Sequence, residues 1–322
     1  MMKKYQKILI TIISIILLLW LGLFTVSHAV YHRSTMATVV EVYFRVIGTK
    51  NKFQYEKDVK DYIESKRNAK KFELPNIKFK STIDSFSINK NTIFKLNNND
   101  NKVIILYLHG GAYINEASSF QLKFIDKVAN KLDAEAYIPI YPLAPNHTYE
   151  ETYDLLNELY SKLLDEDKDI IIMGDSAGGG LALAFTEYLK ENSVTLPDKL
   201  VLLSPWVDVS MENEDIKNYE KSDPMLSSYG LIEYGRLWAG DTDLKDYKIS
   251  PIYGDLKALP DTLLFVGTRE IFYPDVVLLN DKLNENNTKS KLIIGTGMNH
   301  VYPVYPISEA NDAINEIVNF IK

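Results

Sequence analysis

The chain has 322 residues, of which 46% are hydrophobic and 25% charged, enough for one large domain or a domain with an insertion. Its net charge of −7, with no basic tract beyond the extreme N-terminus, argues against nucleic acid as a partner. The absence of cysteine excludes disulfides, a thiol nucleophile and a zinc–thiolate site, and we expect neither a metal nor a cofactor.

The N-terminus carries a long apolar run. Residues Ile8–Val26 contain no charged side chain and follow a lysine-rich start. About 17 to 25 apolar residues are needed to cross a bilayer, whereas the apolar part of a secretory signal is usually shorter. We therefore predict that residues 1–30 anchor the chain in the cell membrane, with the remainder outside the cytoplasm. The small residues of Ser27-His28-Ala29 would also suit cleavage of a signal peptide, which would leave a secreted protein.

The next segment, residues 31–80, is predicted to be helical. It contains a short amphipathic stretch, Met36–Val46, and a charge-rich stretch, Tyr55–Lys71. Two runs of alternating polarity follow at Ile83–Ile88 and Thr92–Leu96, a pattern typical of half-exposed edge strands joined by a turn.

Beyond residue 100, continuous apolar runs alternate with helical stretches. Runs buried on both faces and separated by helices indicate an α/β fold with a mostly parallel central sheet and helices on both faces. The predicted strands are Val103–Leu108, Ala136–Ile140, Ile170–Met173, Leu200–Leu203, Leu263–Val266 and Leu292–Ile294.

The spacing of these strands lengthens after Trp206. We predict an inserted lid at about residues 207–250, within a main domain 81–322, that meets the helices of residues 31–80 over the site. Four aromatic residues of this insertion could line a pocket, or belong to the core as aromatic side chains more often do: Tyr219, Tyr229, Tyr234 and Trp238.

The glycine-rich stretch Gly174–Gly180, with the sequence GDSAGGG, directly follows one predicted strand. It lacks the Gly-Lys-Ser/Thr ending of a phosphate-binding loop and the G-x-G-x-x-G of a dinucleotide site. It matches G-x-S-x-G, in which the serine occupies a strained strand-to-helix turn and the glycines avoid collisions with neighbouring backbone. The motif predicts that Ser176 is a nucleophile.

A serine nucleophile needs a base and an acid that orients the base. Among five histidines, His300 follows the strand Leu292–Ile294, and reactive groups of open α/β sheets gather beyond the carboxyl ends of strands. The acid should lie between serine and histidine in the chain, where Glu270 and Asp275 follow the strand Leu263–Val266. We favour Glu270, which is nearer to the strand end, and keep Asp275 as the alternative.

Backbone N–H groups should stabilise the oxyanion of a tetrahedral intermediate. Ala177, directly after the nucleophile, supplies one. His109 and the glycines Gly110 and Gly111 follow the strand Val103–Leu108 at the position of an HGGG-type motif, so the N–H groups of both glycines are predicted to supply the rest.

Taken together and in order, these motifs resemble the hormone-sensitive-lipase-like family of α/β-hydrolases, which includes bacterial esterases and the arylacetamide deacetylases. The joint occurrence is far more specific than any one motif, and it covers roughly residues 100–305. The matching segments are His109–Gly111, Tyr141–Pro145, Gly174–Gly179, Ser204–Trp206, Asp223–Met225, Ser250–Pro251 and Gly297–His300.

The resemblance implies a hydrolase that cleaves small-molecule or lipid acyl esters through an acyl-enzyme, beneath a helical cap formed by the N-terminal segment and the insertion. It also implies that Asp175 orients the oxyanion loop, with His109 in a supporting position. Two departures stand out: Glu270 replaces the usual aspartate, and Ala112 replaces the third glycine of HGGG. An acyltransferase, an amidase or deacetylase, and a non-catalytic ligand-binding relative are the alternative functions.

Overall fold

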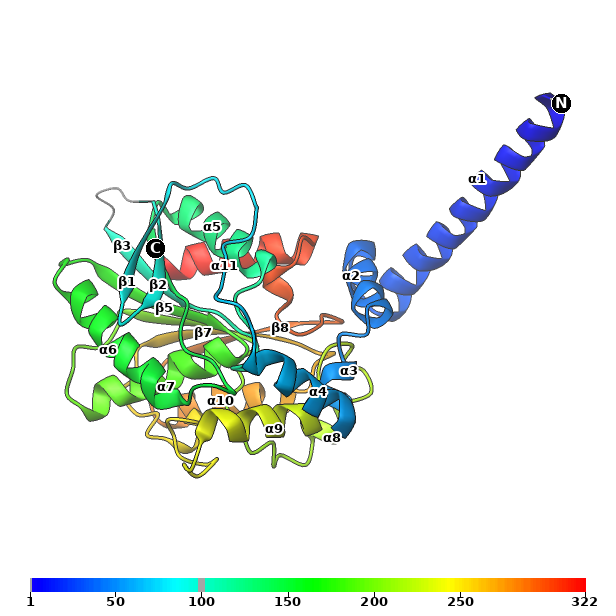
Figure 1. The fold of residues 1–322 in the computed structure, drawn as a ribbon. Helices are drawn as coiled ribbons and strands as arrows, with labels where there is room; N and C mark the ends of the chain where they lie inside the picture. Colours follow the sequence, from blue (N-terminus) through cyan, green and yellow to red (C-terminus); the bar gives the residue numbers. More distant parts are fainter. Residues whose placement is uncertain (1, 98–101) are drawn as a thin grey trace.

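The centre of the molecule is an eight-stranded sheet, which lies between two sets of helices (Figure 1). The structure is a computed structural model that describes residues 2–97 and 102–322. The strands are β1 Ile83–Ile88, β2 Asn91–Leu96, β3 Val103–Leu108, β4 Glu135–Pro139, β5 Asp169–Asp175, β6 Lys199–Leu203, β7 Asp261–Gly267 and β8 Ser290–Gly295. Across the sheet they follow the order β1-β2-β4-β3-β5-β6-β7-β8.

All six continuous apolar runs of the sequence form strands, and β4, β3, β5, β6, β7 and β8 pair in parallel. The prediction of a mostly parallel α/β sheet is therefore confirmed. Two details differ from expectation. β2 is not an edge strand, because it pairs antiparallel with both β1 and β4. β8 is not buried on both faces, because it forms the other edge of the sheet and pairs only with β7.

Helices cover both faces of the sheet (Figure 1). One set packs with the apolar side chains of one face, and a second set packs with those of the other. The first set is α5 Ser119–Leu132 and α11 Ser308–Ile321. The second set is α6 Tyr149–Leu164, α7 Ala177–Glu191 and α10 Tyr273–Glu285. Because the helices cover the two faces of the sheet, the loops gather beyond the carboxyl ends of the parallel strands, where a site can form.

The segment before β1 and the insertion after β6 each supply short helices, and those of the two segments contact one another. They are α2 Thr35–Val46, α3 Asn51–Gln54, α4 Glu56–Arg67, α8 Ile216–Tyr219 and α9 Ser228–Ala239. A Cβ built on Gly230 of α9 would lie 2.4 Å from the Cα of Phe53, so this glycine permits the close approach of α3. Tyr234 and Trp238 of α9 are fully buried, as core residues are.

The N-terminal helix α1, Met2–Thr25, projects away from the rest of the molecule (Figure 1). It continues through a π-helical turn, η1 Val26–Val30, and the combined stretch Lys4–Val30 is long and apolar enough to cross a membrane. None of its apolar window is buried against the protein, and a membrane anchor and a signal peptide both have this form. Two short 3₁₀ helices, η2 Pro251–Tyr253 and η3 Tyr302–Val304, complete the fold.

Candidate active site

Ser176 occupies the turn between β5 and α7, where its backbone adopts φ 53° and ψ −123°. A non-glycine residue in such a conformation costs on the order of 1–3 kcal/mol and persists only where its surroundings hold it. Here its N–H donates to the carbonyl of Leu203 over 2.9 Å, and its carbonyl accepts from the N–H of Trp206 over 2.9 Å. The strained turn predicted from the sequence is present, and the motif glycine Gly178 is required because a Cβ there would lie 2.1 Å from the carbonyl oxygen of Leu108.

The structure brings Ser176, His300 and Glu270 together. The Nε2 atom of His300 lies 2.9 Å from the Ser176 hydroxyl, and its Nδ1 atom lies 2.5 Å from Oε2 of Glu270. All three side chains are buried. The three residues come from the loops that follow β5, β7 and β8, so the carboxyl edge of the sheet is what unites them.

Ser204 is a residue of this site for which sequence analysis predicted no role. Its hydroxyl donates to Oε1 of Glu270 over 2.7 Å and accepts from the N–H of Val301 over 3.0 Å. The N–H of Gly267 also donates to Oε1, over 2.5 Å. Every oxygen of the Glu270 carboxylate thus has a partner, which fixes the carboxylate beneath the imidazole. The only sequence signal for Ser204 was its place in the Ser204–Trp206 motif.

The His300 imidazole is surrounded by carboxylates. Burial, the largest cause, disfavours the charged imidazolium, but the nearby carboxylates, chiefly Glu270, together outweigh burial and raise the pKa of His300 above its ordinary value. Asp223 and Asp175 add to this attraction from farther away. The site therefore stabilises a proton on His300, which is the state that a general base reaches after it accepts one.

Asp223, from the insertion, holds the loop that carries Glu270. Its Oδ2 accepts from the N–H of Ile271 over 3.0 Å, and its Oδ1 accepts from the N–H groups of Met225 and Leu226. Burial raises the pKa of this fully buried carboxyl to about 6. The motif Asp223–Met225 is visible in the sequence, but the sequence alone does not indicate its role.

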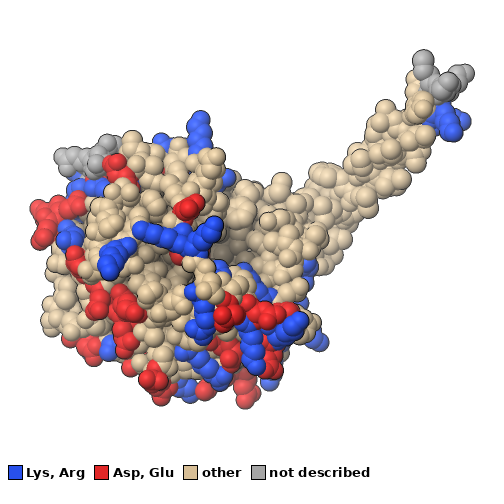
Figure 2. Space-filling view, in the orientation of Figure 1, with Lys and Arg blue, Asp and Glu red and all other residues tan. Residues whose placement is uncertain are grey.

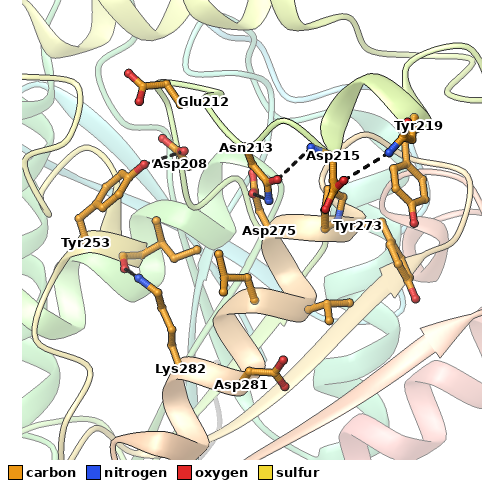
Figure 3. Close-up of a pocket in the computed structure, with 15 residues that line it drawn as sticks. Asp208, Glu212, Asn213, Asp215, Tyr219, Tyr253, Tyr273, Asp275, Asp281 and Lys282 are labelled. Atoms are coloured by element: carbon orange, nitrogen blue, oxygen red, sulfur yellow. Dashed lines mark hydrogen bonds between the residues drawn. The ribbon is translucent and has the colours of Figure 1, made fainter.

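Asp275, the alternative acid, lies elsewhere. It belongs to the first turn of α10 and lines a separate cavity of about 740 Å³ (Figure 3). Its Oδ1 accepts from Asn213 over 2.7 Å, and its buried Oδ2 has no partner among the described residues. Burial raises the pKa of Asp275 to about 7. Within residues 2–97 and 102–322, no group of three or more His, Asp or Glu side chains is placed to hold a metal ion.

In the loop after β3, one of the N–H groups that the sequence predicted to bind an oxyanion already has an acceptor. The N–H of Gly110 donates to Oδ1 of Asp175 over 3.0 Å and is therefore occupied. The N–H groups of Gly111, Ala112 and Ala177 have no acceptor within the described part of the chain. Gly111 and Ala112 line the same pocket as Ser176, and both have positive φ angles, 142° and 55°.

Asp175 and His109 support this loop from beneath. Asp175 also accepts from the Tyr107 hydroxyl over 2.5 Å and from Gln121 over 2.8 Å, and burial raises its pKa. The buried His109 ring stacks on Tyr141 with centroids 4.4 Å apart, and burial lowers its pKa to about 4. His109 is therefore a neutral packing residue at neutral pH.

The pocket beside Ser176 has a volume of about 360 Å³. Side chains from the N-terminal helices, the insertion and the main domain line it, and most of the surface that they present to the pocket is apolar. They include Phe44, Phe53, Phe120, Met225, Leu226 and Tyr305. None of the four aromatic residues considered as pocket residues from the sequence is among its lining side chains.

Comparison with known proteins places this architecture in a family. Residues 105–304 match the family model described as the alpha/beta hydrolase fold. The chain belongs to this family. An esterase from Acinetobacter venetianus is 31% identical over 226 residues, which are 67% of this chain and 74% of that protein.

Two solved structures are similar over most of their length. A candidate esterase from Staphylococcus aureus matches with a TM-score of 0.81 and 30% identity, covering 85% of this chain and 95% of its own. A hormone-sensitive lipase from a metagenome library matches with a TM-score of 0.76 and 27% identity, covering 88% of this chain and 97% of its own. The predicted resemblance to hormone-sensitive-lipase-like α/β-hydrolases is confirmed, and with it the predicted class of ester hydrolase.

Proposed function

We propose that this protein is a serine ester hydrolase in which Ser176 is the nucleophile, His300 the general base and Glu270 the acid that orients His300. The observation that carries the proposal is the continuous chain of contacts from hydroxyl to imidazole to carboxylate, of 2.9 and 2.5 Å. His300 accepts the Ser176 proton as the hydroxyl attacks the acyl carbon, and Glu270 stabilises the imidazolium that forms. His300 then protonates the departing alcohol.

The oxyanion that forms in this step is stabilised by the N–H groups of Gly111, Ala112 and Ala177. Each such donor is worth roughly 3–4 kcal/mol of the barrier. Gly110, with its N–H held by Asp175, instead sets the path of the loop. Water, activated by His300, then attacks the acyl-enzyme and releases the acid, which leaves Ser176 free for another cycle.

The substrate is a carboxylic ester with a modest acyl group. The esterase and lipase relatives support the type of bond, and the mostly apolar pocket of about 360 Å³ supports the size. We further propose that α2–α4 and the insertion act as the cap over this pocket, since Phe44, Phe53 and Met225 line it. The apolar stretch Lys4–Val30 is proposed to anchor the protein in the cell membrane, with the main domain outside the cytoplasm.

The test is Ser176→Ala in the full chain. We expect hydrolysis of p-nitrophenyl acetate to fall by on the order of 10⁴-fold or more, because the other groups have no nucleophile to activate. Labelling by a fluorophosphonate probe should be lost as well. The matched control is Ser87→Ala on the exposed face of β1, which should keep both properties. Undiminished turnover in a folded Ser176→Ala variant would refute the assignment.

A further inference from the structure

Helix α2 has two apolar faces, and only one of them is covered by protein. Ala37 and Phe44 are buried in the core beside α11 and the sheet. The opposite side chains are apolar too, yet 41–78% exposed. They form the α2 face, which consists of Met36, Val39, Val42, Tyr43, Val46 and Ile47. Residues at 36, 39, 43 and 46 share one side of a helix, so this is a continuous stripe.

Helix α4, which follows α2 and α3 in the chain, shows that such a face is not general in this protein. Both helices have 12 residues. The surface of α4 is charged, with residues such as Lys60 and Glu64 exposed to water. Among the charged residues of α2, Glu41 is buried and only Arg45 reaches the surface. A water-facing helix normally exposes polar side chains, so the α2 face is suited to a different medium.

The position of α2 indicates which medium this is. At 1.5 Å per residue, the apolar run Ile8–Val26 spans about 28 Å, close to the roughly 30 Å of a hydrocarbon core. η1 and α2 follow within ten residues, and η1 contacts both α1 and α2. Figure 2 shows a mostly uncharged surface where α1 joins the body. If α1 crosses the bilayer, α2 lies at the depth of the lipid headgroups.

Buried polar contacts fix α2 to the end of the membrane helix. The hydroxyl groups of Ser27 in η1 and Thr38 in α2 are hydrogen-bonded over 2.8 Å, and Arg33 pairs with Glu41 over 2.6 Å. Glu41 also pairs with Arg269, the residue before the proposed acid. These partners lower the pKa of Glu41 to about 2, although burial alone would raise it. α2 is thus held in one position relative to both α1 and the active site.

We propose that the α2 face lies in the interfacial region of the lipid bilayer that α1 crosses. Apolar side chains gain free energy when they leave water for this region, and a tyrosine such as Tyr43 is favoured at its polar boundary. The occupant is thus a lipid surface rather than a second protein. The proposal requires α1 to remain attached, and it does not depend on the assignment of Ser176.

A consequence for the substrate follows, and it rests on the proposed function. Phe44, between Tyr43 and Arg45 in α2, lines the pocket beside Ser176, as does the partly exposed Phe120. The same helix therefore contacts the bilayer on one side and the substrate on the other. Esters dissolved in the membrane are the class that this arrangement favours.

The first test uses the absence of cysteine from the chain, which allows single labels without background. Val46→Cys, at the most exposed position of the α2 face, is labelled with an environment-sensitive dye in the full chain, reconstituted in phosphatidylcholine–phosphatidylglycerol vesicles. We expect doxyl lipids to quench the dye and iodide in the water not to quench it. The control is Ser87→Cys on β1, far from α1 (Figure 1), which should show the reverse.

Two results would overturn the docking proposal. Quenching by iodide at both positions means that the α2 face lies in water. Protection at Val46→Cys from both quenchers means that protein, such as a second copy of the chain, covers the face.

The second test concerns the substrate. Val39→Glu combined with Val46→Glu should lower hydrolysis of an ester dissolved in the vesicles and leave hydrolysis of water-soluble p-nitrophenyl acetate unchanged. If the substituted chain hydrolyses each ester at the same rate as the parent chain, the inference that the enzyme prefers esters dissolved in the membrane is contradicted. A parent chain that cleaves neither ester, yet keeps the quenching pattern, would refute the proposed function and not the docking.

Discussion

Glu270 and Asp275 are two buried carboxylates that lie five residues apart in the chain but in different regions of the molecule. Glu270 lies in the loop at the carboxyl edge of the sheet, where Ser204, Gly267 and His300 contact its two oxygens. Asp275 faces the cavity of Figure 3, where one oxygen contacts Asn213 and the other has no partner among the described residues. Burial is common to both, so the partners make the difference.

This comparison teaches that burial alone does not make a carboxylate suitable for catalysis. A fully hydrogen-bonded carboxylate stays in one orientation and can stabilise a neighbouring positive charge. At Asp275, burial raises the pKa to about 7, and the single hydrogen bond from Asn213 does not offset this effect. Substitution of Glu270 should therefore lower the catalytic rate, whereas substitution of Asp275 should change the pH dependence of stability.

The largest effect is expected for Glu270→Gln. The amide keeps the size of the side chain but cannot stabilise the imidazolium of His300, so kcat should fall by about 10³–10⁴-fold. Asp275→Asn should change kcat by less than about threefold, because Asp275 contacts no residue of the site. Steady-state kinetics of both purified variants measures the contrast. A greater loss from Asp275→Asn would reverse the roles given to the two acids.

The pH dependence of kcat/KM should reveal the same contrast. His300 must be neutral to accept a proton, and Glu270 raises its pKa, so activity should fall as the pH decreases through a midpoint above about 6.5, the ordinary value for histidine. In Glu270→Gln, the residual activity should show a midpoint at lower pH. In Asp275→Asn, the midpoint should stay where it is. An unchanged midpoint in Glu270→Gln would mean that Glu270 does not act on His300.

The smallest effect concerns stability and belongs to Asp275. Its folded pKa of about 7 lies above the ordinary value near 3.9, so the folded protein binds this proton more tightly than the unfolded chain does. The contribution of Asp275 to the stability of the parent protein should therefore decrease as the pH rises from about 4 to 7. Asp275→Asn removes this loss, so its Tm relative to the parent should increase between about pH 4 and 7. Thermal unfolding at several pH values measures the difference, and a constant difference would contradict the raised pKa.

The sequence alone predicted the sheet, the strained turn that carries Ser176 and the position of His300 beyond the last strand. The strands could be predicted because continuous apolar runs separated by helical stretches are a local pattern. Ser176 could be predicted because its strained turn requires glycines at fixed spacing, such as Gly178, which approaches the backbone of β3. His300 followed from its place after the last strand, because the parallel sheet brings all carboxyl ends to one edge.

Only the tertiary structure decided the details between segments that lie far apart in the chain. The sequence favoured Glu270 over Asp275 by its distance from the strand end but left both open, and only the folded structure shows that Glu270 is the carboxylate that reaches the imidazole of His300. Ser204 and Asp223 hold the Glu270 loop through contacts across 66 and 48 positions of the chain. Gly110 looked like an oxyanion donor because its motif position is right, yet its N–H is bonded to Asp175. Hydrogen bonds act over about 3 Å in space whatever the separation in sequence, and only the packed fold sets those distances.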